Sequence, residues 1–153
     1  MMLHLFFFFY PIVLFDDEQI LVNVPPSLIR RCKSHFFNTE KGVSFIFGVN
    51  GWIWIYPSST DVTVSGSTTS AGEFTKIEQP TLRIPPEIRQ RMARVRNCIL
   101  LLATYGIEVY PNSVMKAYNL STEINVAPAD LLVPEVAAVI ADSVRSYLSK
   151  LSF

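Results

Sequence analysis

The side chains that could perform covalent chemistry in this 153-residue chain are few and far apart. The best catalytic combination is the thiol of Cys98 with the imidazole of His35 and a carboxylate as third partner. Cys98, however, lies beside an apolar run inside a predicted helix, where an inert buried thiol is expected. The separated carboxylates of Glu108 and Glu123 give no argument for an acid–base pair. The sequence therefore predicts that the chain is not an enzyme.

Cysteine and histidine are also too scarce for a metal or cofactor site. The cysteines are Cys32 and Cys98, and the histidines are His4 and His35. The two cysteines fit no CxxC spacing and allow at most one disulfide, and two free thiols in a reducing compartment are the favoured state. No glycine-rich phosphate loop precedes a predicted helix. We expect no metal, no cofactor and no small-molecule substrate.

A group of basic side chains has a different chemistry, the binding of phosphate. Its members, close together in the sequence, are Arg30, Arg31, Lys33 and His35. They lie largely away from the apolar stripe of a short helix predicted from Ser27 to about Phe37, a stripe formed by Leu28, Ile29, Cys32 and Phe36. We identify the basic group as a candidate contact for single-stranded RNA. The competing interpretation is a solvated basic face, on a chain whose formal net charge is zero.

The elements that position these residues are organised around a hairpin. The apolar and aromatic runs Val43–Phe47 and Trp52–Tyr56 flank the tetrapeptide Gly48-Val49-Asn50-Gly51, which predicts two antiparallel strands. Asn50 and Gly51 suit a type I′ turn, in which both adopt positive φ. Because both strands are apolar at nearly every position, we expect both faces to be covered. Candidate structural or partner-binding residues of the hairpin are Gly48, Asn50, Gly51, Trp52 and Trp54.

A long helix after the hairpin carries a second set of candidates. Residues 57–81 are rich in Ser, Thr and Gly and are interpreted as a mobile insertion, with Phe74 and Ile77 as possible anchors. The helix is predicted to start at Pro85-Pro86 and to end at Gly106. Its apolar stripe is flanked by arginines, which either cover apolar neighbours and pair with acids or bind a partner. The candidates on this helix are Arg94, Arg96 and Asn97.

The remaining elements are predicted from the same signals. Ile20–Val24 reads as a strand and Ile107–Tyr110 as a short one. Helices are expected from Asn112 or Ser113 to about Leu120, and from Pro134 to the C-terminus. We divide the chain into an atypical apolar segment at 1–18 and one domain at 19–153. The segment at 1–18 is a weak targeting segment, a strand with a partner, or a mistaken translation start, and the last is favoured.

The order of strand, short helix, hairpin and long helix resembles a KH-like arrangement. The fold class is therefore predicted as α+β, a divergent type I KH-like small sheet covered by helices, with a C-terminal helical extension. A KH GxxG loop joins two helices, whereas the tetrapeptide at 48–51 joins two strands. The corresponding helix junction would fall near Arg30-Arg31-Cys32-Lys33, which has no glycine. The sequence resembles a KH fold without its nucleotide-gripping loop.

Four ordered blocks are similar to the C-terminal half of one eukaryotic RNA exosome cap subunit, the ribosomal-RNA-processing protein four. The blocks are Val24–Phe36, Gly48–Ile55, Arg94–Ile99 and Asp130–Val136. The resemblance implies a non-catalytic subunit that binds exosome ring subunits and single-stranded RNA in 3′–5′ RNA processing, including rRNA maturation. It also implies the nucleus, nucleolus and cytoplasm. In that family an N-terminal domain and an OB-fold domain precede the KH-like part, and here residues 1–17 stand in their place.

Two other functions stay open. A secreted or membrane-attached protein is suggested by the apolar segment Leu3–Phe15, by the even cysteine count and by the N-glycosylation pattern at Asn119. A stand-alone KH module could instead bind RNA through Arg30, Arg31 and Lys33. We expect no membrane contact in the exosome interpretation.

Overall fold

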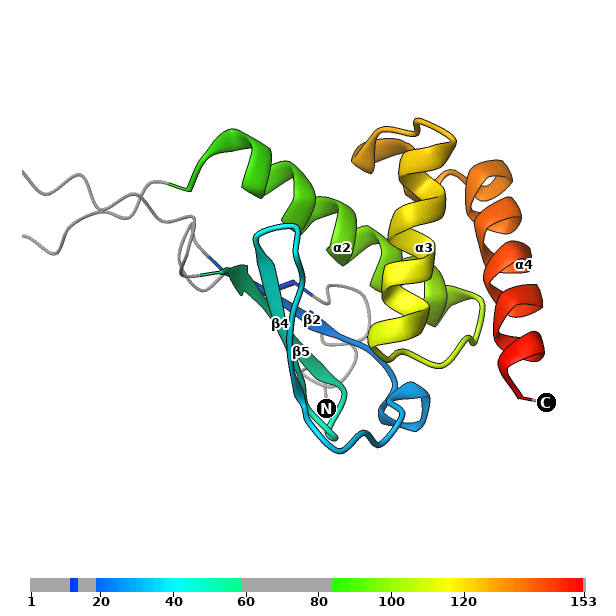
Figure 1. Ribbon diagram of the computed structural model, residues 1–153, viewed down its shortest axis with the longest axis horizontal. Coiled ribbons are helices and arrows are strands. Elements are labelled where there is room, and N and C mark those ends of the chain that lie inside the picture. The colour runs from blue at the N-terminus through cyan, green and yellow to red at the C-terminus, as the bar shows by residue number, and fades with distance from the viewer. Residues whose placement is uncertain (1–11, 14–18, 59–83, 153) are drawn as a thin grey trace, which may run out of the picture.

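The structure is a computed structural model that describes residues 12–13, 19–58 and 84–152. In Figure 1 a small sheet lies on one side, α2 (Pro86–Thr104) runs across it, and α3 (Pro111–Glu123) and α4 (Pro134–Leu151) form a second helical group beyond α2. The predicted segment at 1–18 lies outside the described residues except for β1 (Ile12–Val13). The predicted insertion, with Phe74 and Ile77, also lies largely outside them.

The sheet is antiparallel throughout and has the order β1-β2-β5-β4-β3. Its strands after β1 are β2 (Ile20–Asn23), β3 (Phe36–Asn38), β4 (Val43–Phe47) and β5 (Trp52–Pro57). The predicted hairpin is confirmed as β4 and β5, with Phe45 opposite Ile55. The predicted strand at Ile20 is confirmed as β2, and Val22 lies opposite Ile53. The fold is α+β and KH-like, as predicted.

The turn of the hairpin differs from the prediction. Gly51 N donates to Gly48 O at 3.0 Å, and Gly48 N donates to Trp52 O at 2.8 Å. Of these turn residues only Gly51 has positive φ, at 91°, so the type I′ prediction for Asn50 is wrong. The loop follows the longer pattern, in which a tight turn ends in one left-handed glycine. Asn50 contributes through its side chain, because its Oδ1 accepts a hydrogen bond from Trp52 N at 3.2 Å.

The predicted helix from Ser27 to Phe37 is wrong. The segment contains only the 3₁₀ turn η1 (Pro26–Leu28), then an irregular loop, and its end belongs to β3. The backbone groups that a helix would use are engaged elsewhere: Val109 N donates to Leu28 O at 2.7 Å, and Arg30 N donates to Val109 O at 3.3 Å. The end of the segment, Phe36 and Phe37, is in strand β3 and pairs with β4. Tertiary hydrogen bonds have overridden the helical spacing.

Helix α2 lies at the centre of the core, as its apolar stripe predicts. One side packs on the helix-facing side of the sheet and the other contacts α3 and η2 (Pro128–Leu132). Its buried residues therefore exceed one stripe and are Ile88, Met92, Val95, Asn97, Cys98, Ile99, Leu101 and Leu102. The all-round apolar run that begins at Cys98 is explained by this two-sided burial.

The C-terminal elements follow the predictions with one exception. Both α3 and α4 form as expected, and α4 buries Ala137, Ile140, Ala141 and Val144. The strand predicted at Ile107–Tyr110 is reduced to a single parallel bridge between Val109 and Ile29. Pro111 starts α3 immediately afterwards, which leaves no room for a longer strand.

Among the described residues, helices cover one face of the sheet. Val22, Phe45 and Ile55 on that face are fully buried. Side chains alternate along a strand, so the opposite face carries Trp54 and Phe36, whose exposed fractions are 39% and 67%. Within the hairpin, Ser44 on this face is buried and Trp54 is exposed, so the expectation that both faces are covered fails at Trp54. The helix-free face therefore presents accessible aromatic surface at Trp54 and Phe36.

The hairpin turn generates a stability prediction. A Cβ at Gly51 would lie 2.2 Å from Val24 O, in a backbone region that side chains rarely adopt. Gly51→Ala should therefore lower the free energy of unfolding by more than about 2 kcal/mol. Gly106→Ala is the matched control, since Gly106 has φ of 66° but no atom within 4 Å of the added Cβ, and it should cost only about 1 kcal/mol. Equal urea midpoints for the two variants would contradict the close approach of Gly51 to Val24.

Candidate nucleic-acid interface

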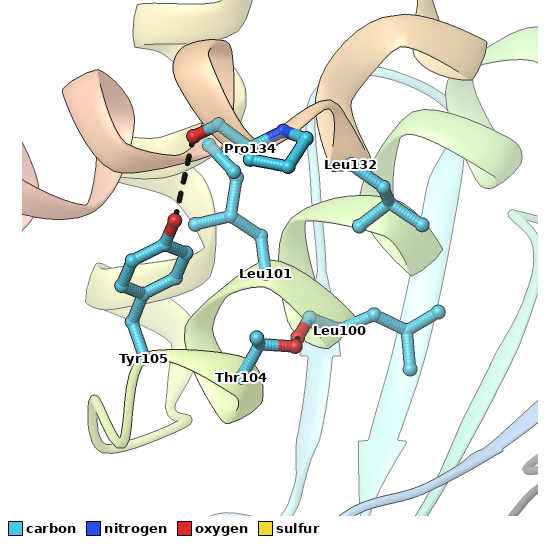
Figure 2. A pocket seen from close by; sticks show the side chains of 7 residues that line it. Leu100, Leu101, Thr104, Tyr105, Leu132 and Pro134 are labelled. Atoms are coloured by element: carbon cyan, nitrogen blue, oxygen red, sulfur yellow. Dashed lines mark hydrogen bonds between the residues drawn. The ribbon is translucent and has the colours of Figure 1, made fainter.

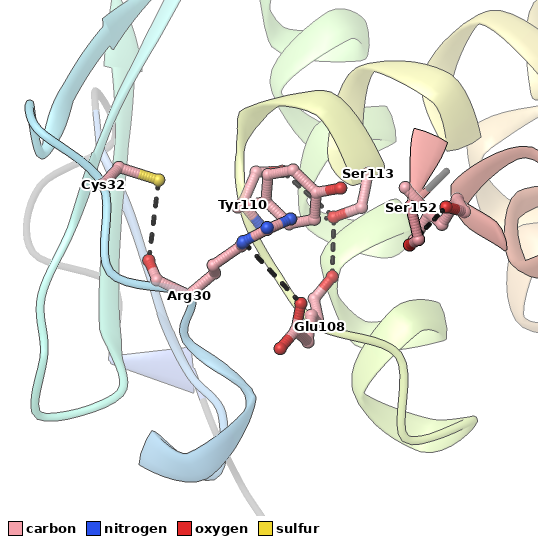
Figure 3. A network of polar contacts seen from close by, with 7 residues as sticks. Arg30, Cys32, Glu108, Tyr110, Ser113 and Ser152 are labelled. Atoms are coloured by element: carbon pink, nitrogen blue, oxygen red, sulfur yellow. Dashed lines mark hydrogen bonds and ion pairs between the residues drawn. The ribbon is translucent and has the colours of Figure 1, made fainter. Parts of the chain in front are cut away.

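Arg30 is held against the connection between α2 and α3. Figure 3 shows its guanidinium beside Tyr110 and Glu108; the Cζ lies 4.8 Å from the Tyr110 ring centroid, and Nε lies 4.0 Å from Glu108 Oε2. The Ser113 hydroxyl accepts from Tyr110 N at 3.1 Å and donates to Glu108 O at 2.7 Å. Arg30 thus covers a buried aromatic ring, and part of its charge is already engaged.

The other members of the basic group lie in the irregular loop before β3. Arg31 and Lys33 are exposed, and within the described part of the chain neither forms an ion pair. His35 is half-buried, and its carbonyl accepts from Phe47 N at 2.9 Å, which fixes the end of the loop. The structure therefore separates the predicted RNA contacts. Arg31 and Lys33 are the accessible cations, whereas Arg30 is anchored.

Arg94 and Asn97 hold the connection between α3 and η2 against α2. Arg94 Nη1 donates to Val126 O at 2.7 Å and to Ser121 Oγ at 3.0 Å. Asn97 Nδ2 donates to Pro128 O at 2.6 Å. Val126 lies in the irregular backbone between α3 and η2, and Pro128 is the first residue of η2, so both bonds hold the start of that turn. Of the roles left open for Arg94 and Asn97, the contacts support the structural one.

Arg96 is the third candidate on α2. Its Nη1 donates to Asn97 Oδ1 at 3.1 Å, and burial lowers the pKa of its guanidinium from the usual value. Its Nε is buried without a hydrogen-bond partner in the described residues. Burying such a donor without a partner costs free energy, and the bond from Nη1 to Asn97 Oδ1 satisfies another donor of the same guanidinium.

The hairpin candidates are structural in their contacts. Gly51 O accepts from Val24 N at 2.9 Å, so the turn joins the end of β2 to the hairpin. Gly48 also lies close to its neighbours, because an added Cβ would lie 2.7 Å from Trp52 O. The indole of Trp54 donates to the Gln19 side chain. This geometry gives the tetrapeptide 48–51 a role in closing the sheet.

The thiol of Cys98 is unsuited to catalysis. Burial raises its pKa from 9.0 to about 12, although the Arg94 charge and a hydrogen bond with Ser121 act in the opposite direction. The thiol is therefore protonated at neutral pH and enclosed by the core. An unfolded thiol ionises at a lower pH, so the folded chain holds the extra proton between pH 9.0 and about 12 and loses stability as the pH rises through that interval.

An apolar hollow of about 320 Å³ lies between the C-terminal end of α2 and the start of α4. Figure 2 shows Leu100, Leu101 and Leu132 around it, with the Tyr105 hydroxyl donating to Pro134 O at 3.4 Å. No charged side chain lines it. The hollow offers mainly apolar contact, and its polar side chains are the hydroxyls of Thr104 and Tyr105.

The N-glycosylation pattern is accounted for by packing. Asn119 and Ser121 lie within α3, and Ser121 is fully buried. The Ser121 hydroxyl donates to Tyr118 O at 2.6 Å and accepts from Arg94. A glycosylation acceptor is expected on a surface loop, so this placement does not favour the secreted alternative.

Within residues 12–13, 19–58 and 84–152, no group of three or more His, Cys, Asp or Glu side chains could hold a metal ion, and both cysteines are free thiols. No helix in the same ranges has the length and apolarity needed to cross a membrane.

Comparison with known proteins connects this geometry to a family. A family model described as a KH domain matches residues 20–61, which contain β2 to β5. The chain is 35% identical over 131 residues to the exosome complex component RRP4 of Bos taurus, and 31% identical over 135 residues to its homolog in Arabidopsis thaliana. It is also 35% identical over 105 residues to the RRP4 homolog of Caenorhabditis elegans. The chain belongs to the RRP4-type family.

The matches cover most of this RRP4-type chain but only part of each relative. They include 86% of the chain for the Bos taurus protein, 83% for Arabidopsis thaliana and 69% for Caenorhabditis elegans. The chain in turn spans 41%, 41% and 32% of those relatives.

Sequence reasoning missed two features of the RRP4-type chain at this site. Phe36 was assigned to a buried stripe and is instead exposed on β3. The stacking of Arg30 on Tyr110 was also missed, because it joins segments far apart in the sequence. A weaker signal for Phe36 existed: two adjacent aromatic residues favour a strand, and the turn at 39–42 leads directly into β4.

The anchoring role of Asn97 is testable. Asn97→Ala removes the hydrogen bond to Pro128 O and leaves that carbonyl and Arg96 without their partner, so the free energy of unfolding should fall by about 1–3 kcal/mol. Asn119→Ala, at an exposed position of α3, is the control and should change it by less than about 0.5 kcal/mol. Urea unfolding measures both. An unchanged midpoint for Asn97→Ala would show that the connection is held without it.

Thiol labelling tests the enclosure of Cys98. In the native chain near pH 8 a thiol reagent should modify Cys32 rapidly, while Cys98 reacts only after urea is added, because it is buried and protonated. The Cys32→Ser variant should therefore show no rapid labelling. Rapid modification of Cys98 in that variant, with an unchanged unfolding midpoint, would contradict the core described above.

Proposed function

We propose that this chain is a non-catalytic component of the RNA exosome that binds single-stranded RNA and contributes to holding the complex together. The observation that carries the proposal is the relation to RRP4 exosome components over 86% of the chain, with the KH match inside it. Its partners are then exosome ring subunits and RNA that undergoes 3′–5′ processing or degradation, rRNA precursors included. Its location is the nucleus, the nucleolus and the cytoplasm.

The site supports a binding role over an enzymatic one. Its accessible cations, Arg31 and Lys33, are suited to contact with phosphate. The candidate nucleophile, Cys98, is buried with a raised pKa. A KH domain is an RNA-binding module, and the chain is matched by that family model across the strands next to this loop. RNA binding by positively charged loop residues needs no cofactor and no small-molecule substrate.

Assembly is tested by recovery of partners from cells. The full chain, tagged at its C-terminus and expressed in its own cells, should retain exosome components through purification, and mass spectrometry identifies them. The Gly51→Ala variant should recover fewer, because it disturbs the folded sheet. A folded and soluble chain that retains none of these components would contradict the assembly proposal.

RNA binding is tested by a charge-matched pair of variants. Arg31→Ala/Lys33→Ala should weaken binding to single-stranded RNA by about tenfold and reduce the slope of affinity against salt, since two phosphate contacts are lost. Arg89→Ala/Lys150→Ala removes the same charge from two exposed helical positions and is the control. Fluorescence anisotropy with a labelled oligouridine at several salt concentrations measures both. Equal losses in the two variants would show a general charge effect.

A further inference from the structure

Phe36 is the most exposed large apolar side chain among the described residues, at 67%. It lies on β3, which is the last strand of the described sheet and is paired there with β4 alone. Its neighbour Phe37 stacks on Phe45 in the core, with ring centroids 5.2 Å apart. Successive strand residues point to opposite faces, so the ring of Phe36 lies on the helix-free face. It is an aromatic surface at the open edge of the sheet.

The backbone around Phe36 is fixed. Ser34 Oγ donates to Phe36 O at 3.1 Å and accepts from Phe36 N at 3.3 Å. The preceding carbonyl, of His35, accepts from Phe47 N at 2.9 Å. The ring therefore projects from a strand whose backbone is held by hydrogen bonds. A ligand that stacks on it would cause little loss of conformational entropy in the protein.

The charges beside Phe36 indicate the chemistry of its ligand. Arg31 and Lys33 lie in the loop immediately before it and are exposed, without an ion-pair partner in the described residues. The chain as a whole has no net charge, so any attraction for an anion is local. An exposed aromatic ring with adjacent cations is the combination that binds single-stranded nucleic acid, through base stacking and phosphate contact. A purely apolar partner would not use the two cations.

We propose that Phe36 stacks on a base of single-stranded RNA while Arg31 and Lys33 contact the adjoining phosphates. The inference rests on the proposed RNA-binding function and assigns it to one edge of the fold. The segment that would carry a helix–loop–helix grip is here an irregular loop followed by β3. The edge strand and its loop supply the stacking and the phosphate contacts in its place.

The test compares Phe36→Leu, which keeps an apolar side chain, with Val139→Leu, an exposed position on α4. Phe36→Leu should weaken binding to labelled oligouridine by about tenfold, because base stacking is lost. Val139→Leu should bind within twofold of the unaltered chain, and Phe36→Trp should retain the affinity. Matching urea midpoints establish that the variants are folded.

A ligand lacking bases separates stacking from phosphate contact. The unaltered chain should bind an abasic oligomer with the same backbone more weakly than oligouridine, with the affinity that the Phe36→Leu variant has for oligouridine. The Phe36→Leu variant should bind the two oligomers with equal affinity. Equal oligouridine affinity of Phe36→Leu and the unaltered chain overturns the stacking role, while RNA binding itself stands. If the Phe36→Leu variant keeps its RNA affinity but no longer retains exosome components, the ring contacts a protein, and the stacking role is overturned as well. If the unaltered chain does not bind RNA, the proposed RNA-binding function is contradicted as well.

Discussion

The two-sided burial of α2 is the constraint on which the rest of the structure depends. One side of the helix closes the core above the sheet, and the other receives α3 and η2. A helix that is apolar only along one stripe could pack against one of these layers. The apolar run from Cys98 to Leu102 lets α2 pack against both. Because solvent is excluded from both sides of the helix, the thiol of Cys98 is fully buried.

Polar side chains complete this arrangement where regular structure ends. Arg94 and Asn97 donate to carbonyls of the backbone that follows α3, and Arg91 Nη1 donates to Lys41 O at 2.9 Å in the turn before β4. Arg145 Nη2 in the same way donates to Tyr105 O at 2.6 Å. Arginine suits this work because its planar donors reach carbonyls in several directions.

Periodic segments were predictable from the sequence, and segments set by long-range contacts were not. The hairpin and the helices α2, α3 and α4 each carry a local pattern that agrees with the fold. The stripe of Leu28, Ile29, Cys32 and Phe36 fits helical spacing, but parallel pairing of Ile29 with Val109 and strand pairing of Phe36 with Ile46 prevail. For the candidate site, Arg31 and Lys33 could be identified as accessible cations. The anchoring of Arg30 depends on Tyr110, which no local pattern connects to it.

The short strands at the two sides of the sheet bear on self-association. β1 has two residues and β3 has three, so each offers few free backbone groups along which a second chain could pair. Arg31 and Lys33 add charge repulsion beside the β3 edge when two copies approach. An aromatic ring can therefore stay exposed next to β3 without turning that edge into a template for intermolecular strand addition.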